Sequence, residues 1–458
     1  MTLNFAKQRF LVLGAGVTGS AVARSLQARG GIVAITDDVA TDALKPEAVD
    51  LNNYDAVVIS PGWRQDHPLV IKVLASDLKI LNEVDLAWQI RAEMAPGQKW
   101  LALTGTNGKT TTVEMTAKIM QTAGLKAVAC GNVGDTVIDA VDRTDPYDYL
   151  VLELSSFQLH WSQEAEYVSA AILNIADDHL DWHGDFDSYA NAKFSILDRA
   201  KVAILNADDG EIVKRSNRFT DRKVFFSLDT PAPGEIGVVE ELLVDRAFVT
   251  DPQQAAMICE LADIKPTVPH NVSNALAAAA LARSVDISHE IIQTALQEFR
   301  PGRHRIETVY ESDSIAWVDD SKATNPHAAS ASLMSHLSVV WIAGGLAKGA
   351  DMNAMIDRCK GRIKVAVLIG TDRHLISEAL TKFAPEIPQL MIDAPADYSR
   401  GGQSNGLMEE VVKAALGHAS AGDTVLMAPA CASMDQFISY ADRGDRFAAA
   451  VKKLVGHE

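Results

Sequence analysis

The sequence has few cysteines, no long hydrophobic run and no recognisable leader. Its four cysteines, at positions 130, 259, 359 and 431, lie far apart and form no Cys-x-x-Cys pair, which argues against a disulfide framework. No apolar run approaches the roughly 20 residues that a membrane span requires. The first nine residues, MTLNFAKQR, lack the apolar core of a signal peptide. We therefore expect a cytoplasmic protein with free thiols and no membrane partner.

Positive charge is also scarce. The chain has 42 Lys and Arg against 60 Asp and Glu, a net charge of −18. Nucleic acids and anionic membranes select basic surfaces, so neither is an expected partner. If the protein binds phosphates, positive charge must be concentrated at the site. The candidate cations beside glycine-rich or strand-end segments are Lys109, Lys193, Arg305, Lys322 and Lys348.

A glycine-rich loop is the most informative motif that is present. Residues 104–111 read TGTNGKTT and follow an apolar run. Backbone N–H groups in such a loop, with the N-terminus of the next helix, bind anionic oxygens, while Lys109 can reach terminal phosphates and Thr110 can bind Mg²⁺. The spacing is shorter than the standard motif because Leu103 stands where its first glycine would fall, and a plain strand-to-helix turn remains the alternative. The predicted triphosphate site comprises Gly105, Thr106, Asn107, Gly108, Lys109, Thr110 and Thr111.

Apolar runs alternate with helical patterns along most of the chain. This pattern is typical of parallel sheets covered on both faces by helices. We expect an alanine-rich helix over 271–283, and strands at 9–13, 31–37, 56–62, 100–103, 149–154, 170–175, 202–206, 315–319, 339–343, 364–369 and 424–428. Residues 222–250, which are interrupted by proline and glycine, predict a small antiparallel addition.

The length of 458 residues predicts more than one domain. Segments with the composition of a linker lie at 94–98 and 299–305. We therefore predict an α/β protein of three domains: a Rossmann-like domain over 1–95, a central P-loop-type ATPase domain with a mostly parallel sheet over 96–299, and a Rossmann-like domain over 300–458.

A second glycine motif lies near the N-terminus. Gly14-x-Gly16-x-x-Gly19 follows a predicted strand, and Asp37 comes about twenty residues later, which matches the dinucleotide fingerprint. Such a turn can bind any diphosphate, and a chain that also carries a triphosphate loop has less need of a redox cofactor. We interpret it as a nucleotide-diphosphate site, with NAD as the rival ligand.

Two strand ends carry candidate metal ligands. Glu153 ends an apolar run beside the phosphate loop, where a carboxylate could hold the Mg²⁺ of a bound triphosphate, although a capping carboxylate is the alternative. His179 lies in the loop 174–181 among carboxylate and amide side chains, which fits a cation site better than a structural histidine. The residues alone give no reason to assign Lys193 more than a place on a solvated helix.

Together the motifs resemble the Mur ligase family. The similarity rests on segments in all three predicted domains: 104–110 (TGTNGKT), 153–159 (ELSSFQL), 178–181 (DHLD), 270–276 (HNVSNAL), 304–305 (HR), 320–325 (DSKATN) and 429–437 (PACASMDQF). Several motifs in the right order are more specific than any single loop. Residues 211–265 match no motif of the family.

The resemblance implies an ATP-dependent ligase of peptidoglycan precursor synthesis, and thus a role in cell wall biogenesis, cell shape and cell division. The expected reaction adds D-glutamate to UDP-N-acetylmuramoyl-L-alanine through an acyl phosphate and a tetrahedral intermediate. An Asp-Asn-Pro-Arg motif, which a diamino-acid-adding relative would carry, is absent from the sequence. The implied partners are small molecules alone, and a monomer is the default expectation.

The resemblance also implies roles for individual residues. Lys109, Glu153, His179, Lys193 and Lys348 would be catalytic, with two Mg²⁺ ions held by Thr110, Glu153, His179 and a carbamylated Lys193. The ATP contacts would be the loop 105–111 with Asn271, Asn274, Arg305, Asp320 and Lys322. The substrate contacts would be Val17, Thr18, Asp37, Ser60, Gly62, Asn132, Ser155, Thr324, Lys348, Ser433, Met434 and Tyr440, of which Thr324, Lys348 and Ser433 would receive D-glutamate. Tyr440 stands where the family usually has Phe.

Two hypotheses that assign the protein to other functional classes remain open. An NAD-dependent dehydrogenase would need the first glycine motif but would leave Lys109 and Glu153 unexplained. A non-catalytic module would bind ATP without turnover. The density of motifs across the chain favours the ligase over both.

Overall fold

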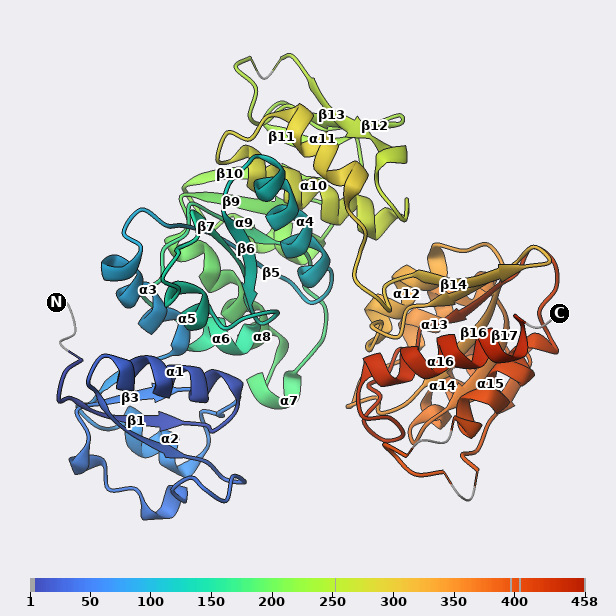
Figure 1. Ribbon diagram of the computed structural model, residues 1–458. Coiled ribbons are helices and arrows are strands. Elements are labelled where there is room, and N and C mark those ends of the chain that lie inside the picture. Colours follow the sequence, from blue (N-terminus) through green and yellow to red (C-terminus); the bar gives the residue numbers. More distant parts are fainter. Residues whose placement is uncertain (1–4, 252, 396–397, 403–404, 457–458) are drawn as a thin grey trace. The chain divides into compact units, whose positions relative to one another are not determined.

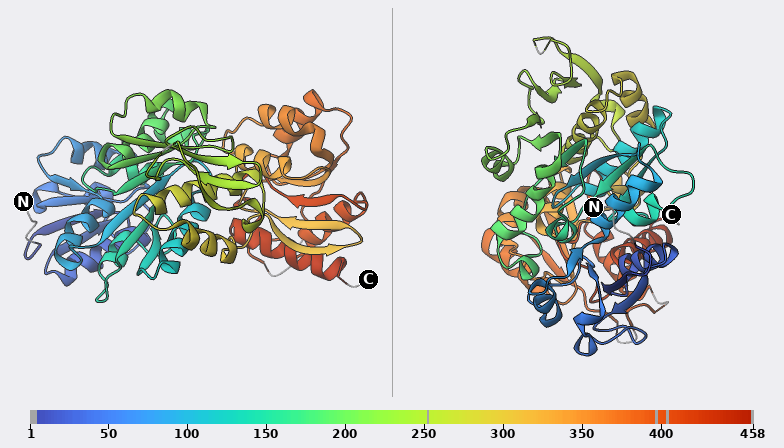
Figure 2. Two further views of the ribbon diagram at one scale, coloured as in Figure 1. Left: turned by 90° about the horizontal axis from the view of Figure 1, so that it is seen from above. Right: turned by 90° about the vertical axis from the view of Figure 1, so that its left-hand side faces the viewer.

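The computed structural model describes residues 5–251, 253–395, 398–402 and 405–456. It divides into two compact units, Met1–Thr267 with Asn271–Phe299, and Val268–His270 with Arg300–Glu458. The first unit contains two sheets and the second contains one. In Figures 1 and 2, helices lie on both sides of the strands within each unit.

The first sheet is a parallel, four-stranded sheet in the order β2-β1-β3-β4. Its strands are β1 (Arg9–Leu13), β2 (Ile32–Thr36), β3 (Ala56–Ile59) and β4 (Lys79–Leu81). The helices of this part of the chain are α1 (Val17–Ala28), α2 (Pro68–Leu74) and α3 (Glu83–Met94). Along β1, Phe10 and Val12 join one core cluster while Leu11 and Leu13 join another, so the sheet buries both faces.

The second sheet has nine strands in the order β13-β12-β11-β10-β9-β8-β5-β7-β6. These strands are β5 (Lys99–Thr104), β6 (Ala127–Gly131), β7 (Tyr149–Glu153), β8 (Ser169–Ile172), β9 (Val202–Asn206), β10 (Arg222–Phe226), β11 (Glu235–Val239), β12 (Leu242–Asp245) and β13 (Ala256–Glu260). The accompanying helices are α4 (Lys109–Thr122), α5 (Val137–Val141), α6 (Ser156–Trp161), α7 (Leu180–His183), α8 (Phe186–Phe194), α9 (Gly210–Ser216), α10 (Pro269–Arg283) and α11 (His289–Glu298).

The nine-stranded sheet is buried on both faces. Trp100 and Ala102 of β5 pack in one core cluster with residues of α5 and α8, whereas Leu101 and Leu103 pack in the other with residues of α4, α10 and α11. The first of these clusters also includes Phe10 and Val12 of the four-stranded sheet, so the two sheets of this unit share one hydrophobic core.

Residues 222–250 differ in part from the expectation of an antiparallel addition. β10 pairs in parallel with β9 and β11, whereas the pairs β11–β12 and β12–β13 are antiparallel. The segment therefore extends the central sheet instead of forming a separate one. Short apolar runs specify strands, but pairing direction depends on how the chain returns between them.

The second unit contains a six-stranded sheet in the order β14-β15-β19-β16-β17-β18, parallel except for the pair β14 and β15. Its strands are β14 (Glu307–Ser312), β15 (Ile315–Asp319), β16 (Val339–Gly344), β17 (Ile363–Ile369), β18 (Gln389–Met391) and β19 (Thr424–Met427). Its helices are α12 (Pro326–Met334), α13 (Asn353–Cys359), α14 (Arg373–Phe383), α15 (Gly406–Leu416) and α16 (Tyr440–Leu454). The expected α/β class is confirmed, whereas the three-domain division remains a prediction.

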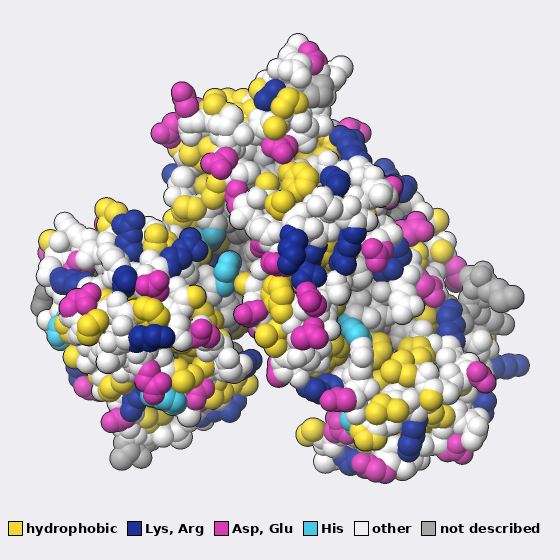
Figure 3. All heavy atoms as spheres, turned by 180° about the vertical axis from the view of Figure 1, so that it is seen from behind, with side chains coloured by type: hydrophobic (Ala, Val, Ile, Leu, Met, Phe, Trp, Pro, Cys, Tyr) yellow, Lys and Arg dark blue, Asp and Glu magenta, His cyan; other side chains and the backbone are white. Residues whose placement is uncertain are grey.

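Charged side chains of both signs are mixed on the surface that Figure 3 draws. Lys and Arg are interspersed there with Asp and Glu among the described residues, instead of forming a single-sign basic face. Within the described parts of the chain, no helix combines the length and the apolar character that crossing a membrane would require. All four cysteines are unpaired and buried.

Asp245 anchors the part of the chain that matched no family motif. The side chain is fully buried, and its Oδ2 lies 3.1 Å from Arg283 Nε and 2.9 Å from His289 Nε2. Its Oδ1 accepts hydrogen bonds from the N–H groups of Ala247 and Phe248. Burial acts to raise the pKa of Asp245, but the hydrogen bonds from His289 and these N–H groups outweigh it and hold the pKa below its usual range.

We expect Asp245→Ala to lower the free energy of unfolding by about 3 kcal/mol, because Arg283 would remain buried without its carboxylate. Since the pKa is depressed in the folded state, the contribution of Asp245 is present above an unfolded pKa of about 4 and is lost as the pH falls through the lower folded pKa. Urea unfolding at pH 7 and pH 3 measures both effects. Asp42→Ala, at an exposed position, is the control. An equal effect of the two substitutions would contradict this role.

Candidate active site

The glycine-rich loop joins β5 to α4, as its sequence predicts. Gly108 is the N-cap of α4 in the left-handed conformation, with φ of 81°. The loop is held by Asn174, whose Oδ1 accepts the Asn107 N–H at 2.8 Å and whose amide donates to the Asn107 carbonyl at 3.0 Å. Thr106 also binds this neighbouring loop, because its hydroxyl accepts the Ala176 N–H at 2.9 Å. The structure thus fixes the loop through the segment that follows β8.

Gly108 is also in close contact with Asn274 of α10. A Cβ atom at position 108 would collide with Asn274 Oδ1, whereas Gly124, with a nearly equal φ of 79°, has open space around it. Asn274 is buried, and so is Asn271 one turn earlier, whose amide donates to the Pro266 carbonyl at 2.9 Å. Two of the predicted ATP contacts, Asn271 and Asn274, therefore lie on one helix, and Asn274 lies against the loop itself.

We expect Gly108→Ala to raise the KM for ATP at least tenfold, because the new methyl group displaces Asn274. Gly124→Ala is the matched control, since both substitutions carry the left-handed strain of roughly 1–2 kcal/mol. Both variants should therefore lose stability in thermal unfolding, and Gly108→Ala should lose more because of its collision with Asn274. Steady-state kinetics with varied ATP separates them, and equal KM values for the two variants would contradict the close contact.

Two lysines converge on this loop. Lys109 Nζ donates to the carbonyl oxygens of Gly105 and Thr106 at 3.0 and 2.9 Å, and Lys193 Nζ donates to Gly105 at 2.8 Å. Lys193 is only 2% exposed, at the end of α8. Burial, followed by the charge of Lys109, lowers the pKa of Lys193 well below its usual value. The Lys109 ammonium beside the loop suits a site that receives negative charge, whereas the lowered pKa of Lys193 favours its neutral amine.

Glu153 is buried at the carboxyl end of β7. The register pairs it with Leu103 of β5, directly before the glycine-rich loop. Its Oε1 accepts a hydrogen bond from Asn132 Nδ2 at 2.9 Å, while Oε2 is buried with no hydrogen-bond partner among the described residues. An unsatisfied buried carboxylate oxygen is costly unless a cation binds it. This donor fits a Mg²⁺ ligand beside a triphosphate.

His179 lies in the loop between β8 and α7 and is exposed. It has a left-handed φ of 54°, its Nε2 is 3.5 Å from Asp178 Oδ2, and its ring centroid is 4.7 Å from that of Phe157. The carboxylates of Asp178 and Glu153 both act to raise the pKa of the neighbouring Lys193. The loop of His179 is thus electrostatically connected to Lys193 and Glu153.

The predicted contacts in the first sheet gather at the carboxyl ends of its strands. Gly14 is close-packed against Ser60 and Trp63, and Asp37 Oδ2 accepts the Ala15 N–H at 2.8 Å. That hydrogen bond and others from the Val39 and Ala40 N–H groups lower the pKa of Asp37. Asp37 therefore fixes the glycine turn, a role that the fingerprint alone does not predict. Exposed in the same region are Val17 and Gly62, with Thr18 partly buried.

Two further predicted substrate contacts have structural roles of their own. Ser155 is the N-cap of α6, and its hydroxyl forms a capping box with Gln158. Asn132 donates its amide to Glu153 and its N–H to the Glu153 carbonyl, so it orients the candidate metal ligand. Neither interaction tests the predicted contact with substrate.

Most of the predicted residues of the second unit lie in loops after neighbouring parallel strands. Strands β15, β19 and β16 lie side by side, so their carboxyl ends share one edge of the sheet. The loops that follow them carry Asp320, Lys322 and Thr324 after β15, Lys348 after β16, and Ser433 and Met434 after β19, and Tyr440 is the first residue of α16. The segments of Lys348 and Ser433 are joined by two hydrogen bonds between Leu346 and Ala432.

These side chains differ in exposure. Asp320 is buried, which raises its pKa to about 7, and Ser433 is buried, whereas Lys348 and Met434 are exposed. Lys322 Nζ lies 4.0 Å from the centre of the Tyr440 ring. Arg305, in the segment before β14, is partly buried.

Comparison with known proteins identifies the family. Models of the Mur ligase middle domain and of the Mur ligase glutamate ligase domain match residues 103–282 and 304–431. The chain is 45% identical to the UDP-N-acetylmuramoylalanine--D-glutamate ligase of Thermobifida fusca, over 98% of this chain and 99% of that protein. It belongs to the Mur ligase family. The ligase of the same name from Streptomyces avermitilis is 43% identical over 98% of this chain and 99% of that protein.

Solved structures share the Mur ligase fold. A pseudomurein peptide ligase type C from Methanothermus fervidus has a TM-score of 0.60 at 19% identity, covering 98% of this chain and 100% of that one. A MurF ligase from Thermotoga maritima, crystallised in complex with ADP, has a TM-score of 0.59 at 17% identity, covering 98% and 95%. The family that the sequence motifs resemble, and the α/β fold that they imply, are therefore confirmed.

The structure of this Mur ligase adds residues that the motifs did not single out. The hydroxyl groups of Tyr189 and Thr106 share a hydrogen bond of 2.9 Å, and His183 Nε2 lies 2.9 Å from Ser156 Oγ. Burial, followed by His160 and His179, lowers the pKa of His183 to about 4. Arg443 is fully buried and binds several loops of the second unit. The sequence offered a signal for one of these residues: His183 lies four positions after the candidate ligand His179.

Proposed function

We propose that this Mur ligase joins D-glutamate to UDP-N-acetylmuramoyl-L-alanine, driven by ATP, in the synthesis of peptidoglycan precursors. The observation that carries the proposal is the triphosphate-type loop with Lys109, Lys193 and the unsatisfied Glu153 oxygen beside it. The chain that contains this site is similar in sequence, over nearly its full length, to ligases named for this reaction. The enzyme is expected to act as a cytoplasmic monomer on small molecules.

The reaction activates a carboxylate, which is a poor electrophile. A carboxylate oxygen of UDP-N-acetylmuramoyl-L-alanine attacks the γ-phosphorus of ATP, and the bond to ADP breaks to give an acyl phosphate. The amine of D-glutamate then attacks the acyl carbon and loses a proton. The tetrahedral intermediate expels inorganic phosphate, which carries away one oxygen of the original carboxylate, and the amide remains. Positioning and charge stabilisation are the main requirements for the protein.

The residues beside the loop suit that requirement. The N–H groups at the start of α4 and the Lys109 ammonium bind and orient the terminal phosphates. Thr110, Glu153, His179 and Lys193 would hold two Mg²⁺ ions, a set that the unsatisfied Glu153 Oε2 supports. Mg²⁺ there would offset charge on the phosphate oxygens. The remaining ATP contacts in this proposal are Asn271, Asn274, Arg305, Asp320 and Lys322.

Lys193 is proposed to act as a carbamate. Its burial and lowered pKa favour the neutral amine, the form that attacks CO₂. The reaction joins the amine nitrogen to carbon and releases one proton, leaving an anionic carbamate. The negative charge of the carbamate is attracted to the Lys109 ammonium, and its oxygens supply ligands for Mg²⁺.

The first sheet is proposed to bind the uridine diphosphate of the acceptor through its glycine turn, in place of NAD. The loops at the carboxyl edge of the six-stranded sheet are proposed to bind D-glutamate through Thr324, Lys348 and Ser433. A buried hydroxyl and an exposed ammonium group suit the two carboxylates of that amino acid.

Phosphate release from ATP and Mg²⁺ tests the proposal. UDP-N-acetylmuramoyl-L-alanine is present throughout, and D-glutamate, L-glutamate, L-alanine or a diamino acid is added in separate reactions. We expect phosphate release and a matching gain in product mass with D-glutamate alone. Turnover with another amino acid would overturn the D-glutamate assignment. Absence of turnover with all four, together with an absorbance change on adding NAD and a hydroxy acid, would favour the dehydrogenase.

A further inference from the structure

Arg443, in the first turn of α16, has an unusual set of partners. It is fully buried, and among the described residues all of its hydrogen-bond partners are uncharged oxygens. Nε donates to Ser321 Oγ at 2.9 Å, and Nη2 donates to the Ser321 carbonyl at 3.0 Å. Burial lowers its pKa to about 10, so the guanidinium remains charged at neutral pH.

The other hydrogen bonds of Arg443 reach two further loops. Nη1 and Nη2 each donate to the Cys431 carbonyl at 3.2 Å, and Nη1 donates to the Gly344 carbonyl at 3.4 Å. Ser321, Gly344 and Cys431 lie at or just after the ends of β15, β16 and β19. One side chain therefore connects the three loops that carry Lys322, Lys348 and Ser433.

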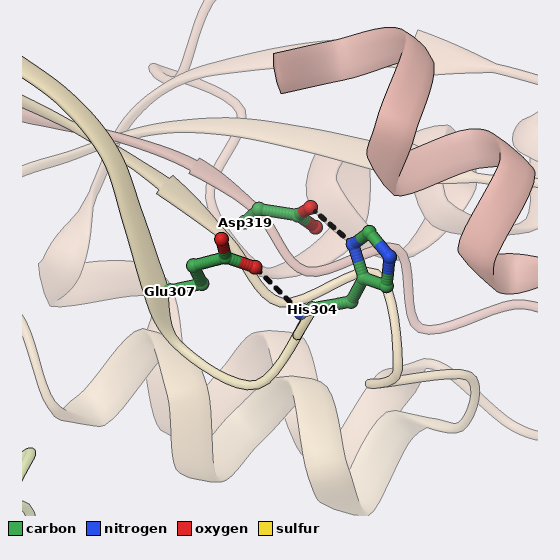
Figure 4. A group of neighbouring side chains, drawn as sticks. All are labelled: His304, Glu307 and Asp319. Carbon is green, nitrogen blue, oxygen red and sulfur yellow. Dashed lines mark hydrogen bonds and ion pairs between the residues drawn. The ribbon is translucent and has the colours of Figure 1, made fainter. Parts of the chain in front are cut away.

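The neighbouring Gly444 brings α16 close enough for these bonds. A Cβ atom at position 444 would collide with His304 Nδ1 and Asp319 Oδ2. Figure 4 shows the His304 ring directed at Asp319, with Glu307 bound to the backbone nitrogen of His304. These three residues could form a metal site by distance, but their mutual hydrogen bonds already occupy the facing atoms.

Ser321, in the loop after β15, forms hydrogen bonds both to its own strand and to α16. Asp319 Oδ1 accepts the Ser321 N–H at 2.9 Å, and the Ser321 hydroxyl donates to the Tyr440 carbonyl at 2.7 Å. The Ser321 hydroxyl thus accepts from Arg443 and donates to α16 at once. A lysine at position 443 would keep the charge but could not reproduce the planar fork that reaches Ser321, Gly344 and Cys431 together.

We propose that Arg443 is a positioning residue that fixes the loop of the predicted ATP contact Lys322 relative to the loops of the predicted D-glutamate contacts Lys348 and Ser433. This inference rests on the proposed function. It assigns Arg443 no contact with substrate. Its consequence is that loss of the fork disturbs the binding of both substrates, although neither touches the guanidinium.

The test compares Arg443→Lys with Arg283→Lys. Arg283 is the matched control because it is also a mostly buried arginine that donates to carbonyl oxygens, but it lies beside Asp245 in the first unit. We expect both variants to lose thermal stability. Only Arg443→Lys should raise the KM for ATP and for D-glutamate, each at least fivefold, with kcat reduced at least tenfold.

Ser321→Ala provides a second variant if Arg443→Lys does not fold. It removes the hydroxyl that accepts from Nε and should raise both KM values in the same direction, by at least twofold. KM values within the error of the wild type in Ser321→Ala, or in a folded Arg443→Lys, would overturn the proposal. Activity of the wild type with D-glutamate keeps this outcome distinct from a failure of the proposed function.

Discussion

Glu153→Gln is expected to abolish nearly all ligase activity, with kcat reduced by about 10³, or about 4 kcal/mol of transition-state stabilisation. The substitution keeps the size of the side chain and an acceptor for the Asn132 amide. It removes the negative charge and leaves a neutral amide where the unsatisfied Oε2 now lies. Affinity for Mg²⁺ should fall with activity, because a neutral amide is a weaker ligand than a carboxylate.

Phosphate release at increasing Mg²⁺ measures both changes. We expect the half-saturating Mg²⁺ concentration of Glu153→Gln to rise at least tenfold. Glu166→Gln, the same substitution at an exposed position, should behave as the wild type. A Glu153→Gln enzyme with unchanged kcat and Mg²⁺ dependence would show that Glu153 is a capping carboxylate and that the metal lies elsewhere.

Lys193→Ala is expected to lower kcat at least about 10²-fold, the effect of losing several kcal/mol of charge stabilisation. The cause is specific: a carbamate would supply oxygen ligands that no alanine can replace. Small carboxylates added to Lys193→Ala should enter the space left by the side chain and restore part of the activity. Phosphate release with and without acetate or formate measures this rescue.

Lys201→Ala, at an exposed lysine, is the control and should keep its activity with or without added carboxylate. Depletion of CO₂ should inactivate the wild type, and bicarbonate should restore it. Two results together would contradict the carbamate: a Lys193→Ala enzyme that stays inactive with every added carboxylate, and a wild-type enzyme whose activity does not depend on CO₂. The unmodified lysine would then be the functional form.

The strands were the most predictable part of the fold. Continuous apolar runs such as 149–154 and 339–343 correspond to β7 and β16, because a strand buried on both faces needs apolar residues at every position. The shorter strands β4 and β18 have no such signal, with three residues each. The parallel pairing of β10 was also not predicted, because the direction in which two strands pair is set by tertiary packing and not by local composition.

The predictability of the site follows the same division. The glycine-rich loop could be predicted from the sequence because the φ of 81° at Gly108 and the close approach of Asn274 both require glycine. The role of Asp37 in fixing the glycine turn, and the bonds of Arg443 to three loops, depend on contacts between residues distant in sequence. One sequence alone does not reveal such contacts.

The most direct test of the central claim follows an oxygen atom. UDP-N-acetylmuramoyl-L-alanine labelled with ¹⁸O in its terminal carboxylate is incubated with ATP, Mg²⁺ and D-glutamate, and the released phosphate is analysed by mass. Formation of an acyl phosphate predicts one carboxylate oxygen in each phosphate, with ADP as the other product. Unlabelled phosphate during amide formation, or release of AMP, would contradict the mechanism.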